Sequence, residues 1–140
     1  MVELLAFSGA CLFLDQWSKK LAEARTTGRS IPLGRLLRIR CVAHRLAGLT
    51  TGRIIPPLLW LTSLACAIAL HNSGTWFQSE TALLGLALAF SGAGGNLIDL
   101  LRRKCVLNFI DLGWWPVFNL ADVWILTGLV MAFWPKGQST

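Results

Sequence analysis

Four long apolar stretches, separated by polar segments, dominate the chain. Residues 54–70 and 81–98 contain no charged residue, residues 1–14 contain only Glu3, and residues 112–134 contain only Asp122. A helix that crosses a bilayer needs roughly 20 mainly apolar residues. The pattern therefore predicts four transmembrane helices, near residues 2–19, 54–71, 80–100 and 112–134.

The polar segment between the first two predicted helices, residues 20–53, contains a different pattern. In residues 35–43, RLLRIRCVA, charged and apolar residues alternate, as they do in a strand with one solvated face. A short amphipathic sheet on the bilayer surface explains this alternation, and so does an arginine-rich loop bound to anionic lipids. The sequence predicts an all-α membrane protein in a single domain, residues 1–140, and leaves these two interpretations of the polar segment open.

Composition supports a membrane protein and argues against nucleic-acid binding. Hydrophobic residues make up 54% of the chain and charged residues only 14%, whereas about a quarter of the residues in soluble domains are charged. The net charge is +6, but most basic residues fall in residues 19–53 and 102–104, which alternating helices place on one membrane face. Basic loops beside membranes more often bind lipid headgroups and set the orientation of the helices than bind nucleic acid. We therefore expect membrane phospholipid as a partner and no nucleic acid.

The four cysteines do not indicate a metal site or a disulfide framework. Their spacing contains no CxxC pair and no Cys/His cluster: Cys11, Cys41, Cys66 and Cys105. Three of them lie in or near apolar stretches, where cysteine is commonly a small hydrophobic residue. We expect no metal ion and no cofactor.

Polar residues inside or beside the apolar stretches are the candidate functional residues. A carboxylate near the centre of a span costs at least about 2.5 kcal/mol. Asp122 lies roughly 15 Å along a helix that starts at Leu112, which is near the midplane of a straight span. Other polar residues lie toward helix ends that alternating topology brings to one face: Asp15, Lys19, Asn96 and Asp99. The simplest interpretation is a polar pocket open to that face.

Structural roles explain several of these residues equally well. Asp15 and Lys19 are four residues apart and could form an ion pair on one helix face. Asn96 and Asn119 could hydrogen-bond between helices, and the small residues of SGAGG would let two helices approach closely. A structural role explains Asp122 less well, because its predicted helix carries no basic partner.

Three segments resemble the lipoprotein signal peptidases (signal peptidase II). They are DQWSKK, GGNLID and NFIDLGWWPVFNLADVWILTG, where the family motifs read approximately D-x-x-[ST]-K, G-N-x-x-D-R, V-V-D-F-I and F-N-x-A-D. The resemblance implies four transmembrane helices with a small extracytoplasmic β-sheet between the first two. It also implies an intramembrane aspartic endopeptidase of the bacterial inner membrane that cleaves the signal peptides of diacylglyceryl-modified prolipoproteins. We expect a monomer.

By this resemblance, Asp122 is one member of a catalytic aspartate pair, and the other falls at position 108, which is asparagine. Two carboxylates in one low-dielectric site share a proton, and an amide cannot replace a carboxylate in that exchange. Asp111 could replace the missing carboxylate only if residues 108–111 are helical. In a strand, an offset of three would place residues 108 and 111 on opposite faces. Gly113 and Pro116 favour a turn or an irregular connection, so we do not expect Asp111 to act in this way.

The resemblance gives five further residues roles in shaping the pocket and binding substrate: Asp15, Lys19, Asn96, Asp99 and Asn119. Leu100 replaces the arginine of G-N-x-x-D-R, and His44 replaces the asparagine of a further family motif. Two hypotheses follow. The chain is either a divergent endopeptidase or a catalytically impaired homologue that binds lipidated precursors, or another amphipathic ligand, without cleaving them.

The distribution of basic residues conflicts with the orientation that the resemblance implies. The family places both basic loops outside the cytoplasm, whereas the positive-inside rule places them inside. We expect the family orientation, with a site that faces the extracytoplasmic side of a multi-pass protein, because the pocket must meet its substrate there.

Overall fold

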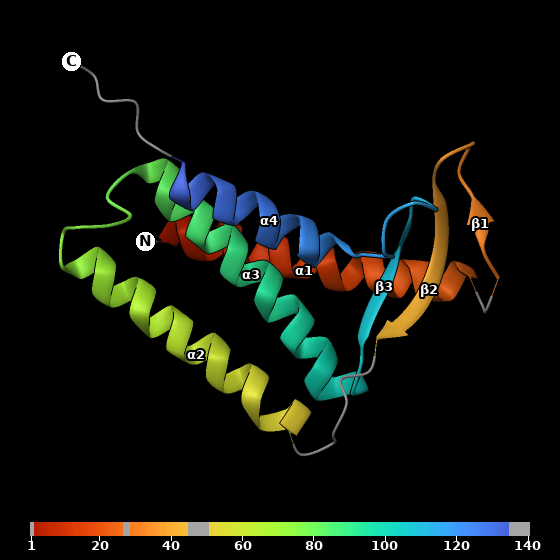
Figure 1. Cartoon of the computed structure of the whole chain (residues 1–140), viewed down its shortest axis with the longest axis horizontal. Helices are drawn as coiled ribbons and strands as arrows, with labels where there is room; N and C mark the ends of the chain where they lie inside the picture. The colour runs from red at the N-terminus through yellow and green to blue at the C-terminus, as the bar shows by residue number, and fades with distance from the viewer. Residues whose placement is uncertain (1, 27–28, 45–50, 135–140) are drawn as a thin grey trace.

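The computed structural model describes residues 2–26, 29–44 and 51–134. In this part of the chain, four helices and three strands follow one another in the order α1, β1, β2, α2, α3, β3 and α4 (Figure 1). Their bounds are Val2–Thr26, Ile31–Pro32, Arg38–His44, Thr51–Asn72, Glu80–Arg103, Val106–Asp111 and Leu120–Phe133. The prediction of four helices with a small sheet is confirmed. His44, which the sequence analysis named, has a side chain outside the described residues.

The first helix is longer than predicted. It continues to Thr26 instead of ending near residue 19, because the sequence LAEAR that follows Lys20 consists of residues that favour helices. Ala22 and Thr26 are buried in this extension, and the Thr26 hydroxyl lies 3.2 Å from the Cys41 sulfur of β2. The additional turns therefore support the sheet.

The fourth helix is shorter than predicted. It begins at Leu120, and the prediction of a start near residue 112 is wrong. The preceding residues form a turn in which Gly113 adopts a φ of 78°, and Phe118 then pairs with Ile110 at the end of β3. The irregular connection that Gly113 and Pro116 predicted is thus confirmed for the residues between β3 and α4.

The sheet has three antiparallel strands in the order β1-β2-β3. Arg38 lies opposite Asp111, and His44 lies opposite Val106, with a register shift between Ile39 and Val42. Residues 38–43 of RLLRIRCVA thus lie in β2, as the sheet interpretation predicted, while residues 35–37 belong to the preceding turn. The sheet is not confined to the segment between the first two helices, however, because β3 lies between α3 and α4.

The sheet packs at one end of the helices (Figure 1). At the junction, the backbone N–H of Leu107 in β3 donates to Asp99 Oδ2 in α3, over 3.3 Å. The sheet therefore lies at the same end of the molecule as the polar ends of α1 and α3.

Helices α3 and α4 touch through glycines. A Cβ atom added to Gly85 would lie 2.6 Å from the backbone nitrogen of Ala132, and one added to Gly128 would lie 2.5 Å from that of Ala89. Gly92, within SGAGG, has no room for a Cβ against the Ala121 carbonyl. Close approach through this small-residue pattern is thus confirmed, and it brings the start of α4 against α3.

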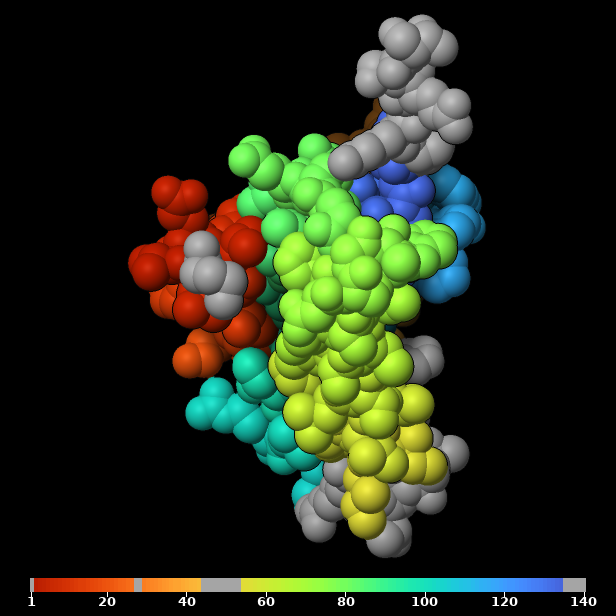
Figure 2. Space-filling model, turned by 90° about the vertical axis from the view of Figure 1, so that its left-hand side faces the viewer, coloured from red at the N-terminus to blue at the C-terminus, as the bar shows by residue number. Residues whose placement is uncertain are grey.

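Helix α2 stands apart from the other three. Of its described residues only Ala67 is buried, and Figure 2 shows α2 in front of the other helices with its outward side uncovered. Within the described ranges, two helical segments are long and apolar enough to cross a membrane, Ile54–Asn72 and Glu80–Arg103. Helix α4 is apolar but shorter, so four membrane spans remain a prediction.

Candidate active site

Asn119 and Asp122 together form the start of α4. The Asn119 side chain accepts a hydrogen bond from the Asp122 backbone N–H, and Asp122 Oδ2 accepts one from the Asn119 N–H, each over 3.0 Å. This reciprocal capping satisfies two backbone donors that a helix start leaves free. Asp122 therefore lies in the first turn of α4, beside the sheet, and not about ten residues along the helix as predicted.

A buried ion cluster joins α1 to α3 next to this helix start. Lys19 Nζ lies 2.8 Å from Asp15 Oδ2 and 2.8 Å from Asp99 Oδ2, and all three side chains are fully buried. The predicted pairing of Asp15 with Lys19 on one helix face is confirmed. Lys19 also donates to Asn96 Oδ1 over 3.1 Å, so that its three N–H groups each have an acceptor.

Asp15 extends this cluster to α4. Its second oxygen, Oδ1, accepts a hydrogen bond of 2.9 Å from the backbone N–H of Ala121. Gly95 permits this arrangement, because a Cβ at that position would lie 2.5 Å from Asp15 Oδ2. The cluster thus holds the first turn of α4 in place relative to α1 and α3.

Asn96 connects the ion cluster with Asp122. Because an ammonium can only donate and a carboxylate can only accept, Lys19 faces the amide oxygen of Asn96 and Asp122 faces its amide nitrogen. The Asn96 Nδ2 to Asp122 Oδ1 distance is 2.9 Å. Asn119, fully buried, donates to Asn96 Oδ1 over 2.9 Å. The predicted hydrogen bonding between helices is therefore confirmed for both asparagines.

Asn108 completes the chain of amides from β3. Its Oδ1 accepts a hydrogen bond of 2.8 Å from Asn119 Nδ2, and its Nδ2 donates to the Val117 carbonyl over 3.0 Å. Asn108 and Asp122 are both half-buried, unlike the ion cluster. In the described part of the chain Asp122 forms no ion pair, and its two oxygens accept hydrogen bonds only from neutral N–H groups.

Asp111 lies on the other face of β3. Burial alternates along this strand, so Asp111 shares the buried face of Leu107 and Phe109, and Asn108 does not. Asp111 Oδ2 is 3.0 Å from Arg40 Nε, and Oδ1 accepts a hydrogen bond from the Gly113 N–H over 2.9 Å. The Gly113 N–H and then the Arg40 charge hold the pKa of Asp111 below its ordinary value. The structure does not bring Asp111 to Asn108 and Asp122.

Gln16 is a side chain of this region that the sequence reasoning missed. Its amide nitrogen lies 3.2 Å from Asp15 Oδ2, 3.3 Å from Asp99 Oδ1 and 3.1 Å from the Gly95 carbonyl. A polar residue directly after Asp15 was the available signal, but glutamine is common at exposed helix positions. The backbone partners Ala121 and Val117 gave no signal at all, because any residue carries the same groups.

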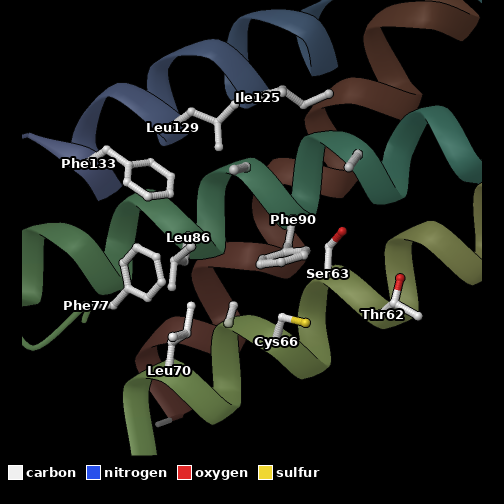
Figure 3. Close-up of a pocket in the computed structure, with 13 residues that line it drawn as sticks. Thr62, Ser63, Cys66, Leu70, Phe77, Leu86, Phe90, Ile125, Leu129 and Phe133 are labelled. Atoms are coloured by element: carbon white, nitrogen blue, oxygen red, sulfur yellow. The ribbon is translucent and has the colours of Figure 1, made fainter. Parts of the chain in front are cut away.

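Two adjoining apolar cavities run from Asn96 between α2 and the pair α3 and α4. The first, of about 370 Å³, contains Asn96 at its polar end and is otherwise lined mainly by apolar residues. The second, of about 460 Å³, shares Ser63, Phe90 and Ile125 with the first and extends to Phe133 (Figure 3). A polar site therefore opens into an apolar groove in a size range typical of ligand sites.

The arrangement can be compared with known proteins. The family described as signal peptidase (SPase) II matches residues 7–135. The chain belongs to this family. It is 33% identical over 136 residues to the lipoprotein signal peptidase of Rhodococcus jostii, covering 91% of this chain and 69% of that protein. The lipoprotein signal peptidase of Geobacillus thermodenitrificans is 33% identical over 137 residues, covering 90% of this chain and 84% of the relative.

The fold agrees with two solved structures described as bacterial membrane enzymes. One has a TM-score of 0.75 at 23% identity, covering all of this chain and 96% of the other. The second has a TM-score of 0.72 at 23% identity, covering 94% of this chain and 85% of the other. This likeness shows the fold, while membership of the signal peptidase II family indicates a bacterial membrane protein.

Proposed function

We propose that this chain binds diacylglyceryl-modified prolipoproteins in the bacterial inner membrane but cleaves them far more slowly than an enzyme with two catalytic aspartates. The observation that carries this proposal is the state of position 108. Asn108 is held between Asn119 and Val117 beside Asp122, and it cannot exchange a proton. The other carboxylates nearby are ion-paired elsewhere: Asp15, Asp99 and Asp111.

Asn108 has the hydrogen-bonding shape of a protonated aspartate. Its Nδ2 donates to the Val117 carbonyl, where the hydroxyl of a neutral aspartic acid would donate, and its Oδ1 accepts from Asn119. A working pair needs one protonated and one ionised carboxylate, which exchange a proton with the attacking water and the scissile carbonyl. Asn108 reproduces the shape of the protonated member and lacks its transferable proton.

The apolar groove supports a lipid-modified ligand. It begins at Asn96, which is hydrogen-bonded to Asp122, and continues between α2, α3 and α4 (Figure 3). An acyl chain or an apolar signal helix would bury its surface in this groove and bring its polar junction to Asn96 and Asp122. Because α2 contributes a single buried residue among those described, it can shift to admit such a ligand.

The site residues then divide into two roles. Asn96 lines the pocket, Asp122 and Asn108 are joined to it by hydrogen bonds directly or through Asn119, and we assign all three to contact with the ligand. Buried side chains cannot contact it, and we assign them a positioning role: Asp15, Lys19, Asp99 and Asn119. We propose a monomer with four spans, both termini in the cytoplasm and the pocket facing the extracytoplasmic side.

Cleavage of a diacylglyceryl-modified prolipoprotein by the purified protein in detergent tests the proposal. We expect Asn108→Asp to raise the cleavage rate by about 10³-fold or more, because loss of one member of a catalytic unit removes most of the rate. The double variant Asn108→Asp with Asp122→Asn should return to background, and Asp111→Asn should change nothing. Co-purification of the uncleaved precursor should be equal for the unchanged chain and Asp122→Asn.

A second candidate is a cleaving endopeptidase in which Asp122 is the single titrating carboxylate. It is favoured by the intact, half-buried position of Asp122 at the groove. Rapid cleavage by the unchanged chain, abolished by Asp122→Asn and unimproved by Asn108→Asp, would establish this candidate and overturn impaired catalysis. Failure of every variant to bind the precursor would overturn both.

A further inference from the structure

One end of the sheet exposes large apolar side chains on two loops. The β1–β2 turn, residues 33–37, exposes Leu33 by 55% and Leu36 by 75%. The loop after β3 exposes Trp114 by 74% and Trp115 by 56%. Because Arg38 at the start of β2 lies opposite Asp111 at the end of β3, both loops leave the same end of the strands (Figure 1).

Both loops have defined conformations. In the first, the Leu33 N–H donates to the Leu37 carbonyl over 2.8 Å, and Gly34 supplies a φ of 96° that other residues rarely adopt. In the second, the rings of Trp114 and Trp115 stack edge to face with centroids 5.8 Å apart. The exposed apolar groups are thus presented outward on ordered turns.

Two arginines accompany these apolar groups. Arg35 lies in the β1–β2 turn and Arg38 starts β2, and both are exposed. Among the described residues neither forms an ion pair, and the neighbouring Asp111 is already paired with Arg40. We use the term sheet edge for the six residues of this surface: Leu33, Arg35, Leu36, Arg38, Trp114 and Trp115.

We propose that the sheet edge binds anionic phospholipid headgroups of the surrounding bilayer. Tryptophan rings favour the membrane interface, where one side is apolar and the other is hydrated. Arginine forms bidentate hydrogen bonds with phosphate oxygens. The edge combines both features on loops at the helix ends, where a membrane protein meets the headgroup layer. A nucleic acid would use the arginines but would leave Leu33 and Leu36 exposed to water.

This assignment also bears on the orientation of the chain. Arginines that bind headgroup phosphates have a use on the membrane surface besides setting topology. The excess of basic residues around the sheet is then compatible with the extracytoplasmic orientation of the family. The inference needs only a membrane protein with this sheet, and it is independent of whether the chain binds or cleaves prolipoproteins.

Quenching of tryptophan fluorescence by brominated lipids tests the sheet edge. The full chain in detergent is titrated with brominated phosphatidylglycerol and, separately, with brominated phosphatidylcholine. We expect phosphatidylglycerol to quench at lower concentration, and Arg35→Gln with Arg38→Gln to raise its midpoint about 25-fold, since each arginine near an anionic surface contributes about fivefold. With Trp114→Phe and Trp115→Phe, the two lipids should quench the remaining fluorescence at the same concentration.

The matched control is Arg102→Gln with Lys104→Gln. It removes the same charge from exposed residues that precede β3, so that the six-residue strand separates them from the sheet edge by roughly 17 Å. We expect this control to move the midpoint by less than about twofold. Equal quenching by both lipids, equal effects of both charge variants, or a lipid difference that survives Trp114→Phe with Trp115→Phe would overturn the assignment.

Discussion

The ion cluster around Lys19 and the region around Asp122 lie next to each other, but their carboxylates differ in burial and in ion pairing. In the cluster, Lys19, Asp15 and Asp99 are fully buried and bind one another. Asp122 is half-buried and is hydrogen-bonded to Asn96, which lines the end of the apolar groove. Among the described residues its carboxylate accepts hydrogen bonds only from neutral N–H groups. The first region uses its charges to hold helices together, whereas the second keeps a carboxylate available. Burial together with pairing thus separates fully buried, charge-paired residues from a half-buried carboxylate that forms no ion pair among the described residues.

The largest effect should come from Lys19→Met. It leaves Asp15 without a cation and Asp99 with only the more distant Arg103, whose Nε lies 3.8 Å from Asp99 Oδ1. Breaking a buried pair in this way costs about 3–5 kcal/mol of unfolding free energy. Thermal unfolding in detergent measures the loss. Lys20→Met, exposed on the same helix, should change stability by no more than about 0.5 kcal/mol.

Neutralising the whole cluster sharpens this prediction. Lys19→Met combined with Asp15→Asn and Asp99→Asn removes all three charges, and it should recover part of the stability that Lys19→Met loses. Equal stability of Lys19→Met and the unchanged chain would show that the cluster is not structural, and the comparison with Asp122 would fail.

An intermediate effect is expected for Asn119→Ala, because Asn119 belongs to both regions. The substitution removes the N-cap of α4 and the donor to Asn96 and Asn108, at a cost of about 2 kcal/mol. Asn119→Ser keeps an oxygen that can cap the helix, so about half of the loss should remain. Chemical denaturation in mixed micelles compares the two, and equal losses would show that capping contributes nothing.

The smallest effect should come from Asp111→Asn, outside both regions. Because the pKa of Asp111 is lowered in the folded chain, its contribution to stability is present above its ordinary value of 3.8 and is lost as pH falls through the lowered pKa. The unfolding midpoints of the unchanged chain and the variant should therefore differ at pH 6 and converge as the pH falls through the lowered pKa of Asp111. Arg40→Gln should retain most of this difference, since the Gly113 N–H is the larger cause. A pH-independent difference would contradict the assignment.

The sequence anticipated much of the site because its motifs lie in continuous stretches. Asn96, Asn119, Asp122 and the Asp15–Lys19 pair were all singled out, and the structure brings them into one hydrogen-bonded network. The strand β3 was missed because VLNFID is too short and too apolar for its periodicity to separate strand from helix. The start of α4 was predicted too early for a similar reason, because the loop between β3 and α4, residues 112–119, is as apolar as a membrane helix.

Local patterns were sufficient to predict the number of helices and the strand β2, because hydrophobic periodicity depends only on neighbouring positions. The asparagine at position 108 was read directly from the sequence. Partners that come from distant segments were not available in this way. Asp15 binds the backbone of Ala121 across 106 positions of the chain, and Lys19 meets Asp99 on another helix. A hydrogen bond depends on where two atoms lie in space, and glycine contacts between α3 and α4 bring those atoms together only after the chain has folded.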